Sequence, residues 1–480
     1  MSLEDVKRKI VRSYNEGPLA WWDRNQLRAS LKIKKGKEHE LVRYRPILMN
    51  IVDQQDMRKI IKEHLDLKLI EPGNSAYSSP GFLVRNHGEI KRGKPRLVIN
   101  YKGVNDILEF DGYFIPNREH LINCIRNAKV FSKFDCKSGF YQIRMDEESK
   151  KFTAFSTPQG HYVWNVMPMG LANAPQIFQR KMDNLFKDYF SFMSVYVDDI
   201  LITSKNMEEH VKHLEIFADV CYKEGLVLSE KKAVIASRKM EFLGIEIDVT
   251  GIILQNHIVQ KVQGFPEDLK EKKQLQSFLG VVNFAGCFIN NLAKYRKVFS
   301  PLLKKDVPFI WTDEHREGMR ALKEVCNNLP KLSIPQDEDD IVLYTDASDH
   351  GWAAVLTKIT PKGVEPCRYC SGLFTEEETA RWHINDKEFC AVRKAFKKWP
   401  LFLLAKKFIL RVDKTQVKAF LQNKMESKPE KARLLRWQAD CQYYIFDVEI
   451  IKSHENILAD FLTRDGADSP QESDIHQDHY

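Results

Sequence analysis

The chain has 480 residues and a mass of 56.1 kDa, which is enough for three or more packed units with a core each. Hydrophobic residues make up 43% and charged residues 29%, as in ordinary globular proteins, and no apolar run reaches the roughly 18 residues of a membrane span. The 9 cysteines follow no regular framework, which indicates reduced thiols in a cytosolic setting. Cys367 and Cys370 form a single pair without the second pair that a zinc site would need.

Positive charge is concentrated near the N-terminus. Residues 1–45 hold 12 Lys or Arg against 6 Asp or Glu, in a chain whose net charge is +8. A basic segment of this kind suits a phosphate backbone, but it also suits a solvated linker, and both interpretations stay open. Trp21 and Trp22, which lie within this segment, predict a helix that packs by its aromatic side chains.

The pattern of the chain changes several times after the basic segment. From Arg43 to about Asp248, short β-type runs alternate with helical stretches, and the residues from 257 to about 330 are helical in pattern. Two prolines and the acidic run 336–340 then predict a linker. A new α/β unit extends from Ile341 to about Arg464, and the acidic, polar residues 465–480 are expected to be frayed.

Three aspartates are predicted to meet at the ends of β segments. A β-type run ends at Asp135, and a tight turn containing Gly139 follows. Further along, Asp198 and Asp199 lie between apolar β-formers, as at the tip of a hairpin. Like charges repel, so a fold keeps such carboxylates together most readily around a cation, and a hard divalent ion such as Mg²⁺ or Mn²⁺ suits oxygen ligands. An isolated pair would more often be a solvated turn, but a strand-end aspartate facing the pair predicts a two-metal site.

We expect these aspartates to contribute unequally. Neighbouring residues of a strand point to opposite faces, so Asp198 and Asp199 cannot share the metals equally. Asp135 and Asp198 are therefore the predicted principal ligands, and Asp199 is the predicted supporting one.

Three motifs in this order resemble the palm of reverse transcriptases. They are Phe134-Asp135 followed by Phe140, then Met167-Pro168-Met169-Gly170-Leu171-Ala172-Asn173-Ala174-Pro175, then Tyr196-Val197-Asp198-Asp199. The resemblance implies an α/β (α+β) right-hand polymerase with fingers, palm and thumb. It also implies that one metal acts on the primer 3′-hydroxyl while the other holds the triphosphate.

The resemblance further implies basic residues around the incoming triphosphate. Arg96, in Arg96-Leu97-Val98-Ile99-Asn100-Tyr101, is the first choice because a guanidinium matches phosphate oxygens, and Arg85 and Lys94 are further candidates. An exposed strand arginine is the alternative for Arg96. Lys232 resembles the family lysine that is proposed to give a proton to pyrophosphate, although an exposed lysine without that role is the favoured interpretation.

Two apolar residues are implied at the nucleotide. Phe140 falls at the family's steric gate, where a ring beneath the sugar would exclude a ribose 2′-hydroxyl and so favour deoxynucleotides. A plain core aromatic is the alternative for Phe140. Met169 stands where retroviral enzymes commonly have Gln, so the polar contacts of those enzymes are not expected there.

A second set of acids follows the linker. Asp346 and Asp413 come after β-type runs, while Glu388 and Asp460 lie in helical patterns. This order resembles RNase H. The resemblance implies a mixed sheet flanked by helices, with a second two-metal site that activates water against an RNA phosphodiester.

Other polar residues near this set receive no catalytic role. His454 precedes the last acid, but its neighbours differ from the histidine loop of some RNases H, so an exposed loop histidine is favoured. Asp349 and Asp386 are interpreted as surface residues.

The chain resembles the enzymes of plant pararetroviruses, in particular the caulimovirus family with its badnaviruses and tungro bacilliform-like viruses, and it is similar to Gypsy-like retrotransposons. About 95 residues separate Gly251 from Asp346, which matches the short arrangement of these enzymes. The implied domains are a basic N-terminal extension, fingers and palm, a helical thumb with a short connection, an RNase H domain and an acidic tail, at residues 1–40, 41–256, 257–335, 336–466 and 467–480.

The implied function is RNA- and DNA-templated DNA synthesis with degradation of RNA in RNA:DNA hybrids, using two Mg²⁺ per active site or Mn²⁺ as an alternative. The implied partners are an RNA template, a DNA primer/template, the RNA:DNA hybrid, dNTPs and a host tRNA primer, with no membrane. We expect a monomer, with a dimer left open, in cytoplasmic replication bodies of the host cell and in the virion. Two rivals are a catalytically silent nucleic-acid-binding subunit, which the full set of acids disfavours, and an RNA-templated RNA polymerase, which Phe140 disfavours.

Overall fold

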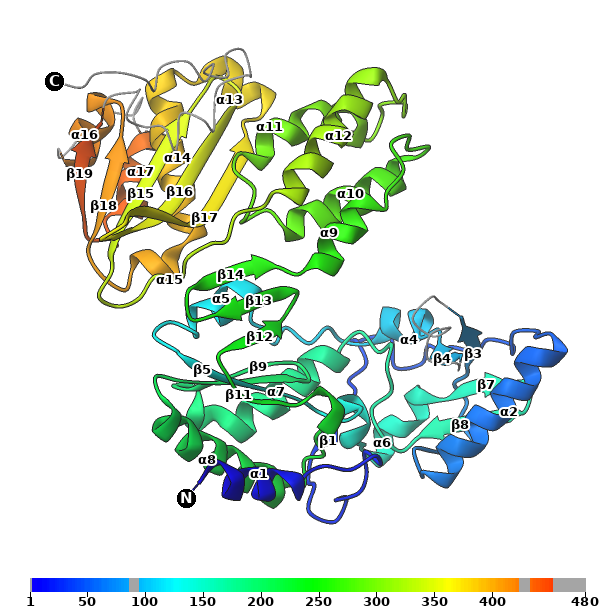
Figure 1. Cartoon of the computed structure of the whole chain (residues 1–480). Helices are drawn as coiled ribbons and strands as arrows, with labels where there is room; N and C mark the ends of the chain where they lie inside the picture. Colours follow the sequence, from blue (N-terminus) through cyan, green and yellow to red (C-terminus); the bar gives the residue numbers. More distant parts are fainter. Residues whose placement is uncertain (1, 86–94, 423–431, 452–480) are drawn as a thin grey trace. The chain divides into compact units, whose positions relative to one another are not determined.

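The computed structural model describes residues 2–85, 95–422 and 432–451 (Figure 1). The chain divides into two compact units, one up to Met240 and one from Glu241, which we call the N-terminal unit and the C-terminal unit. Within the described ranges, no helix combines the length and the apolar character needed to cross a membrane.

A four-stranded sheet carries the first set of acids in the N-terminal unit. Its order is β11-β5-β10-β9, and every neighbouring pair is antiparallel. The strands are β5 (Val130–Asp135), β9 (Met193–Tyr196), β10 (Asp199–Ser204) and β11 (Val234–Ser237). The inner strand β10 is rich in Ile and Leu and is buried after its first residue, as expected for a strand covered on both faces.

Three helices pack around this sheet, namely α1 (Leu3–Val11), α7 (Ala174–Phe186) and α8 (Met207–Glu224). Helix α8 packs against β5 and β10, α7 against β9, and α1 against α8. The rings of Phe134 and Phe217 stack at 4.5 Å, so β5 and α8 share one core. Helix α8 begins after an Asn206 N-cap and ends at Gly225, whose φ of 65° is left-handed.

A second, five-stranded sheet in the N-terminal unit has the order β2-β8-β7-β3-β4. Its strands are β2 (Ile70–Pro72), β3 (Ser79–Val84), β4 (Arg96–Ile99), β7 (Phe155–Thr157) and β8 (Gly160–Trp164), and α2 (Ile51–Asp66) packs against β2 and β3. The shorter elements are β1 (Arg28–Ala29), β6 (Arg144–Met145), α4 (Lys102–Ile107), α5 (Arg118–Asn123), α6 (Glu147–Lys150), η1 (Gly139–Gln142), η2 (Lys151–Thr153), η3 (Lys187–Tyr189) and η4 (Glu230–Lys232).

The predicted helix around Trp21 and Trp22 is wrong. Helix α1 ends at Val11, and the two tryptophans lie in turns beyond Gly17-Pro18, a pair that disfavours helix continuation. The ring of Trp22 instead forms a cation–π contact, because the Arg144 guanidinium lies over it at 4.2 Å from the ring centre.

The C-terminal unit begins with a small sheet and a helical region. The sheet consists of β12 (Lys239–Phe242), β13 (Ile245–Asp248) and β14 (Gly251–Leu254). The helices that follow are α9 (Asn256–Gln263), α10 (Lys272–Phe284), α11 (Leu292–Arg296), η5 (Lys297–Phe299), η6 (Pro301–Leu303) and α12 (Asp313–Asn327). This confirms the predicted helical stretch. In α12 the buried residues Met319, Leu322 and Cys326 recur at helical spacing, so one face packs inward.

A mixed five-stranded sheet of order β17-β16-β15-β18-β19 forms the second part of the C-terminal unit (Figure 1). β15 (Asp340–Ala347), β16 (Gly351–Thr360) and β17 (Gly363–Leu373) are antiparallel, while β18 (Phe408–Val412) and β19 (Phe446–Ile450) run parallel to β15. The helices are α13 (Glu376–Arg381), α14 (Ile384–Lys398), α15 (Pro400–Leu403), α16 (Thr415–Gln422) and α17 (Ala432–Cys441). Helix α14 packs against β15 and β16, and the predicted mixed sheet flanked by helices is confirmed.

Candidate active sites

The first candidate site lies where β5 ends and β9 turns into β10. Asp135, the last residue of β5, is the direct cross-strand partner of Asp199. Asp198 belongs to the turn, and its carbonyl oxygen accepts a hydrogen bond of 3.0 Å from the backbone N–H of Cys136. Asp135 and Asp198 line one cavity of about 480 Å³, a volume typical of small-molecule sites.

Asp199 is held differently from the other two aspartates. Its carboxylate pairs with the Lys133 ammonium at 3.1 Å, and it is not among the residues that line the cavity. The expected reason for this inequality, alternation along one strand, does not apply, because Asp198 is a turn residue outside β10. The turn, rather than the pleat, separates the two neighbours.

The turn is held by a buried glutamine that sequence reasoning missed. Val197 has a φ of 52°, which is unfavourable for a β-branched residue. The side-chain oxygen of Gln179, in α7, accepts a hydrogen bond of 2.7 Å from the Val197 N–H, and its amide donates to Val195 O at 3.0 Å and to Asp183 at 2.9 Å. Gln179 is fully buried, so these bonds fix the aspartate turn against α7.

The electrostatics of the cavity favour a bound cation. Burial raises the pKa of Asp198, and the charges of Asp135 and Asp199 raise it further. The Lys232 ammonium lies 3.0 and 2.9 Å from the two carboxylate oxygens of Asp135 and offsets part of this repulsion. The carboxylate oxygens come from separate chain segments and are partly desolvated, a donor set that fits a hard divalent cation.

Three more of the predicted residues line the same cavity, namely Arg96, Phe140 and Met169. The Arg96 guanidinium lies against the Met169 sulfur. The half-buried Phe140 ring meets Phe178 edge to face at 5.5 Å. A Cβ at Gly139 would lie 2.9 Å from Phe178 Cζ, so glycine at this position lets Phe178 support Phe140.

Arg85, another predicted triphosphate contact, is not in the cavity lining. Arg85 donates to Asp53 and to Asp56 of α2, each at 2.7 Å. These ion pairs hold the end of β3 to α2 instead of facing Asp135. Lys94 lies outside the described residues.

The second candidate site brings together three of the four predicted acids. Asp346 is at the end of β15, Glu388 is in the first turns of α14, and Asp413 directly follows β18. Because β15 and β18 are parallel and in register, their carboxyl ends meet at one edge of the sheet. One carboxylate oxygen from each acid lies within 4.8 Å of the others. Asp460 and His454 lie outside the described residues.

The carboxylates of Asp346, Glu388 and Asp413, which we call the triad, lie close enough together to repel one another. Burial, followed by the charges of Asp346 and Asp413, raises the pKa of Glu388 to about 9, although the backbone N–H of Ala347 donates to its carboxylate. Lys414 pairs with Asp413 at 3.0 Å and offsets only part of the repulsion. Two buried carboxylates and a half-buried one at this spacing suit a divalent cation, whose charge would replace the missing solvation.

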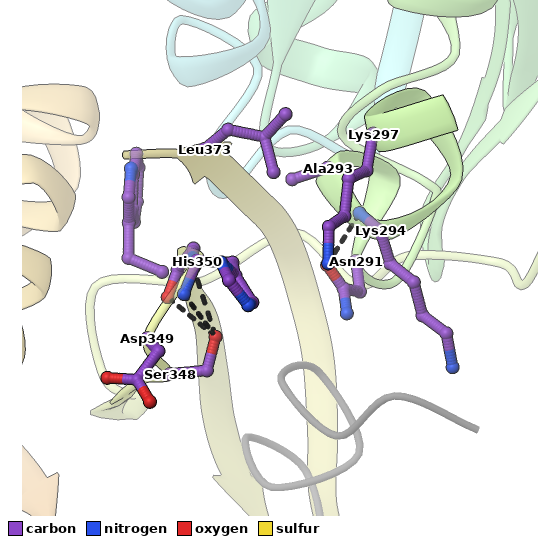
Figure 2. A pocket seen from close by; sticks show the side chains of 10 residues that line it. Asn291, Ala293, Lys294, Lys297, Ser348, Asp349, His350 and Leu373 are labelled. Atoms are coloured by element: carbon purple, nitrogen blue, oxygen red, sulfur yellow. Dashed lines mark hydrogen bonds between the residues drawn. The ribbon is translucent and has the colours of Figure 1, made fainter. Parts of the chain in front are cut away.

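The two aspartates interpreted as surface residues both form ion pairs. Asp386 pairs with Arg433 at 2.6 Å, and Asp349 pairs with the buried Lys387 at 3.1 Å. Figure 2 shows Asp349 in the turn after β15, where it helps to line a cavity of about 250 Å³. In this turn the Ser348 hydroxyl accepts hydrogen bonds from the backbone N–H groups of His350 and Gly351, at 3.3 and 3.2 Å.

Comparison with known families identifies the class of enzyme to which the chain belongs. The family model described as "Reverse transcriptase (RNA-dependent DNA polymerase)" matches residues 84–247. The model described as "RNase H-like domain found in reverse transcriptase" matches residues 311–410. The molecule is therefore a reverse transcriptase with an RNase H-like domain, an enzyme class that works on nucleic acids with divalent metal ions.

Solved structures support the same fold. The foamy viral protease-reverse transcriptase in complex with double-stranded DNA aligns with a TM-score of 0.73 at 23% identity, covering 94% of this chain and 98% of that one. The foamy viral enzyme in complex with an RNA/DNA hybrid aligns with a TM-score of 0.71 at 21% identity, covering 100% and 66%. At these identities the similarity establishes the architecture of a polymerase followed by RNase H.

Sequence relatives identify the family more closely. The enzymatic polyprotein of Cauliflower mosaic virus (strain Strasbourg) is 40% identical over 469 residues, which cover 96% of this chain and 68% of the relative. That of Figwort mosaic virus (strain DxS) is 42% identical over 427 residues, covering 89% and 64%. The chain belongs to the family of caulimovirus enzymatic polyproteins, and the resemblance inferred from its motifs is confirmed.

Proposed function

We propose that DNA synthesis takes place in the cavity around Asp135 and Asp198, and that hydrolysis of the RNA strand takes place at Asp346, Glu388 and Asp413. The observation that supports this assignment is the convergence of carboxylates from separate chain segments at two places, one in each compact unit. We propose Mg²⁺ as the ion at both sites, two per site, with Mn²⁺ as a substitute. Asp460 is proposed as a fourth ligand of the second site.

In the polymerase site, bound divalent ions would supply charge neutralisation for the triphosphate and activation of the primer 3′-hydroxyl. Asp135 and Asp198 would hold the ions, and the Lys133 pair keeps Asp199 in a supporting position. Arg96 binds phosphate oxygens through its guanidinium, while the Met169 sulfur packs against that group in place of a polar contact.

Two further residues of this cavity act on the nucleotide. Phe140, supported by Phe178, fills the space that a ribose 2′-hydroxyl would need. Lys232 lies on the Asp135 carboxylate and is the proposed proton donor to pyrophosphate. The Arg85 ion pairs with Asp53 and Asp56 favour a structural role for Arg85, and a triphosphate contact from Lys94 stays a prediction.

In the RNase H site, the three acids act together on a cation. Without one, the raised pKa of Glu388 means that this carboxyl holds its proton near neutral pH. A cation held by Asp346 and Asp413 would lower that pKa and recruit the Glu388 carboxylate as a further ligand. With a cation bound, Glu388 would therefore act as a deprotonated carboxylate beside Asp346 and Asp413.

Primer extension on RNA and DNA templates, with a labelled RNA:DNA hybrid in parallel, tests this assignment. We expect dNTP incorporation on both templates and cleavage of the RNA strand, both lost with EDTA and restored by Mg²⁺. Nucleic-acid binding without metal-dependent incorporation would instead indicate a silent binding subunit. Preferential incorporation of NTPs would indicate an RNA polymerase.

The cellular setting is inferred from the family alone. We propose a host tRNA as primer, a monomeric enzyme, and work in cytoplasmic replication bodies and in the virion. We also propose the functional boundaries 41–256, 257–335 and 336–466 for fingers and palm, thumb and RNase H. Light scattering of the purified chain at several concentrations tests the monomer, since a dimer would double the measured mass.

A further inference from the structure

A buried lysine lies directly beside one of the RNase H acids. Lys387 precedes Glu388 in α14, and its side chain is only 3% exposed. Its ammonium donates to the Asp349 carboxylate at 3.1 Å and to the Thr379 carbonyl oxygen, near the end of α13, at 3.2 Å. Burying an ammonium is unfavourable unless it is paired and hydrogen-bonded, so these two contacts require a reason.

The partner of Lys387 belongs to the turn that follows Asp346. The turn is closed by a hydrogen bond of 2.9 Å from the Ser348 N–H to the Gly351 carbonyl, and the Phe374 N–H donates to His350 O, also at 2.9 Å. The first bond closes the turn between β15 and β16, and the second ties it to the residue that follows β17. Asp349, whose side chain is 77% exposed, is the residue of this turn that forms the ion pair with Lys387 of α14.

Glu388 contacts the same segment at a second point, because its carboxylate accepts a hydrogen bond from the Ala347 N–H. Two consecutive residues of α14 thus hold residues 346–350 from one side. The carboxylates of Asp346 and Glu388 repel one another at their short separation, and this repulsion would push β15 and α14 apart. An attraction between α14 and the turn opposes that movement.

We propose that Lys387 and Asp349 are a positioning pair that holds the turn after β15 against α14, so that Asp346 and Glu388 are already arranged to share a divalent cation. Neither residue touches the substrate in this role. The inference rests on the proposed function of the three acids as metal ligands.

Lys387→Met tests the pair with little risk to folding. Because Asp349 is exposed, loss of the lysine leaves no buried charge without a partner. Asp349→Asn is the second variant, since it removes the attraction but leaves Lys387 a hydrogen-bond acceptor. Both are made in the full-length chain.

Two readouts do not depend on activity. In EDTA, we expect amide hydrogen exchange of peptides covering 345–351 to be faster in both variants than in wild type. In an Asp198→Asn background, which removes the polymerase metal site, we expect Mn²⁺ binding followed by electron paramagnetic resonance to weaken about tenfold. Hybrid cleavage should need correspondingly more Mg²⁺ at an unchanged KM for the hybrid, while primer extension in the otherwise wild-type chain stays the same.

Lys358→Met is the matched control, because Lys358 is also a poorly exposed lysine of this unit, 13% exposed, and pairs with Asp339 at 3.2 Å away from the triad. Its amide hydrogen exchange at residues 345–351, its Mn²⁺ affinity and its cleavage of the hybrid should all equal those of the wild type. Wild-type exchange and wild-type Mn²⁺ affinity in both test variants would overturn the positioning role. Failure of the proposed function is recognised separately, because Glu388→Gln would then retain cleavage.

Discussion

Phe140 shows how a single side chain depends on its neighbours. Its ring reaches the cavity because Gly139 leaves room for Phe178 behind it. The two packed rings therefore form a rigid wall of the cavity. Such a wall would exclude a nucleotide with a 2′-hydroxyl because the space is filled, not because a hydrogen bond is missing.

Phe140→Val should open this wall to ribonucleotides. We expect the preference for dCTP over CTP, measured as the ratio of kcat/KM values, to fall about tenfold or more, since a pocket enlarged by several carbon atoms no longer rejects the 2′-hydroxyl. DNA synthesis with dNTPs should continue. An unchanged ratio would mean that Phe140 is a core aromatic and that discrimination lies elsewhere.

His210 is a buried residue with a consequence for pH. It lies in α8 between the hydroxyls of Ser132 and Ser204, with ring nitrogens 2.7 Å from each. Burial, with a further contribution from His213, lowers its pKa to about 4. The unfolded chain binds a proton near pH 6.5 and the folded chain does not, so this residue favours folding above pH 6.5, and that contribution is lost as the pH falls towards 4.

The free energy of unfolding should therefore decrease between pH 7 and pH 4.5 by up to about 3 kcal/mol through His210. His210→Gln keeps a hydrogen-bonding side chain but does not titrate, so its decrease over the same range should be smaller. Urea denaturation of both proteins at several pH values measures the difference. Parallel pH dependences would show that other groups dominate.

At the scale of elements, the β9–β10 hairpin owes its position to α7. The Val197 backbone is strained, and the hydrogen bonds of Gln179 compensate for that strain. The buried glutamine lies on the inward face of α7, which is otherwise apolar and includes Ile177, Phe178 and Met182. A polar residue on such a face is retained when it satisfies backbone groups.

Gln179→Leu should loosen the hairpin. The substitution preserves size but removes the partner of the Val197 N–H, so we expect a loss of about 1–3 kcal/mol in stability. Primer extension should fall more than hybrid cleavage does, because Asp198 is carried by this turn. Urea denaturation and the two activity assays check the prediction. Equal losses of both activities would point to general unfolding instead.

The two tryptophans near the N-terminus illustrate an error at this same scale. An aromatic pair in a lysine-rich segment was compatible with an amphipathic helix, but Gly17-Pro18 interrupts any such helix before Trp21. The cation that faces the Trp22 ring comes from Arg144, more than a hundred residues away along the chain, and a local sequence pattern cannot reveal such a contact.

At the scale of the whole molecule, the two sets of acids lie in different compact units and should be separable. We expect Asp198→Asn to reduce DNA synthesis about a hundredfold or more by removing a metal ligand, with hybrid cleavage largely intact. Glu388→Gln should have the reverse effect. Primer extension and hybrid cleavage measured on each variant check both statements. Loss of both activities in one variant that keeps its circular dichroism spectrum would contradict the assignment of two sites.

The sequence by itself determined the fold class and the order of polymerase and RNase H, and it predicted the acids of the two proposed sites, of which the structure brings Asp346, Glu388 and Asp413 together in one unit. It could do so because metal chemistry restricts the residue type, and because strand and turn patterns are local. Only the tertiary structure decided that Asp198 is a turn residue, that Arg85 binds α2, and that Asp349 is paired with Lys387. These facts depend on strand register and on side chains brought together from distant parts of the chain, and contacts of that kind leave no periodicity in the sequence.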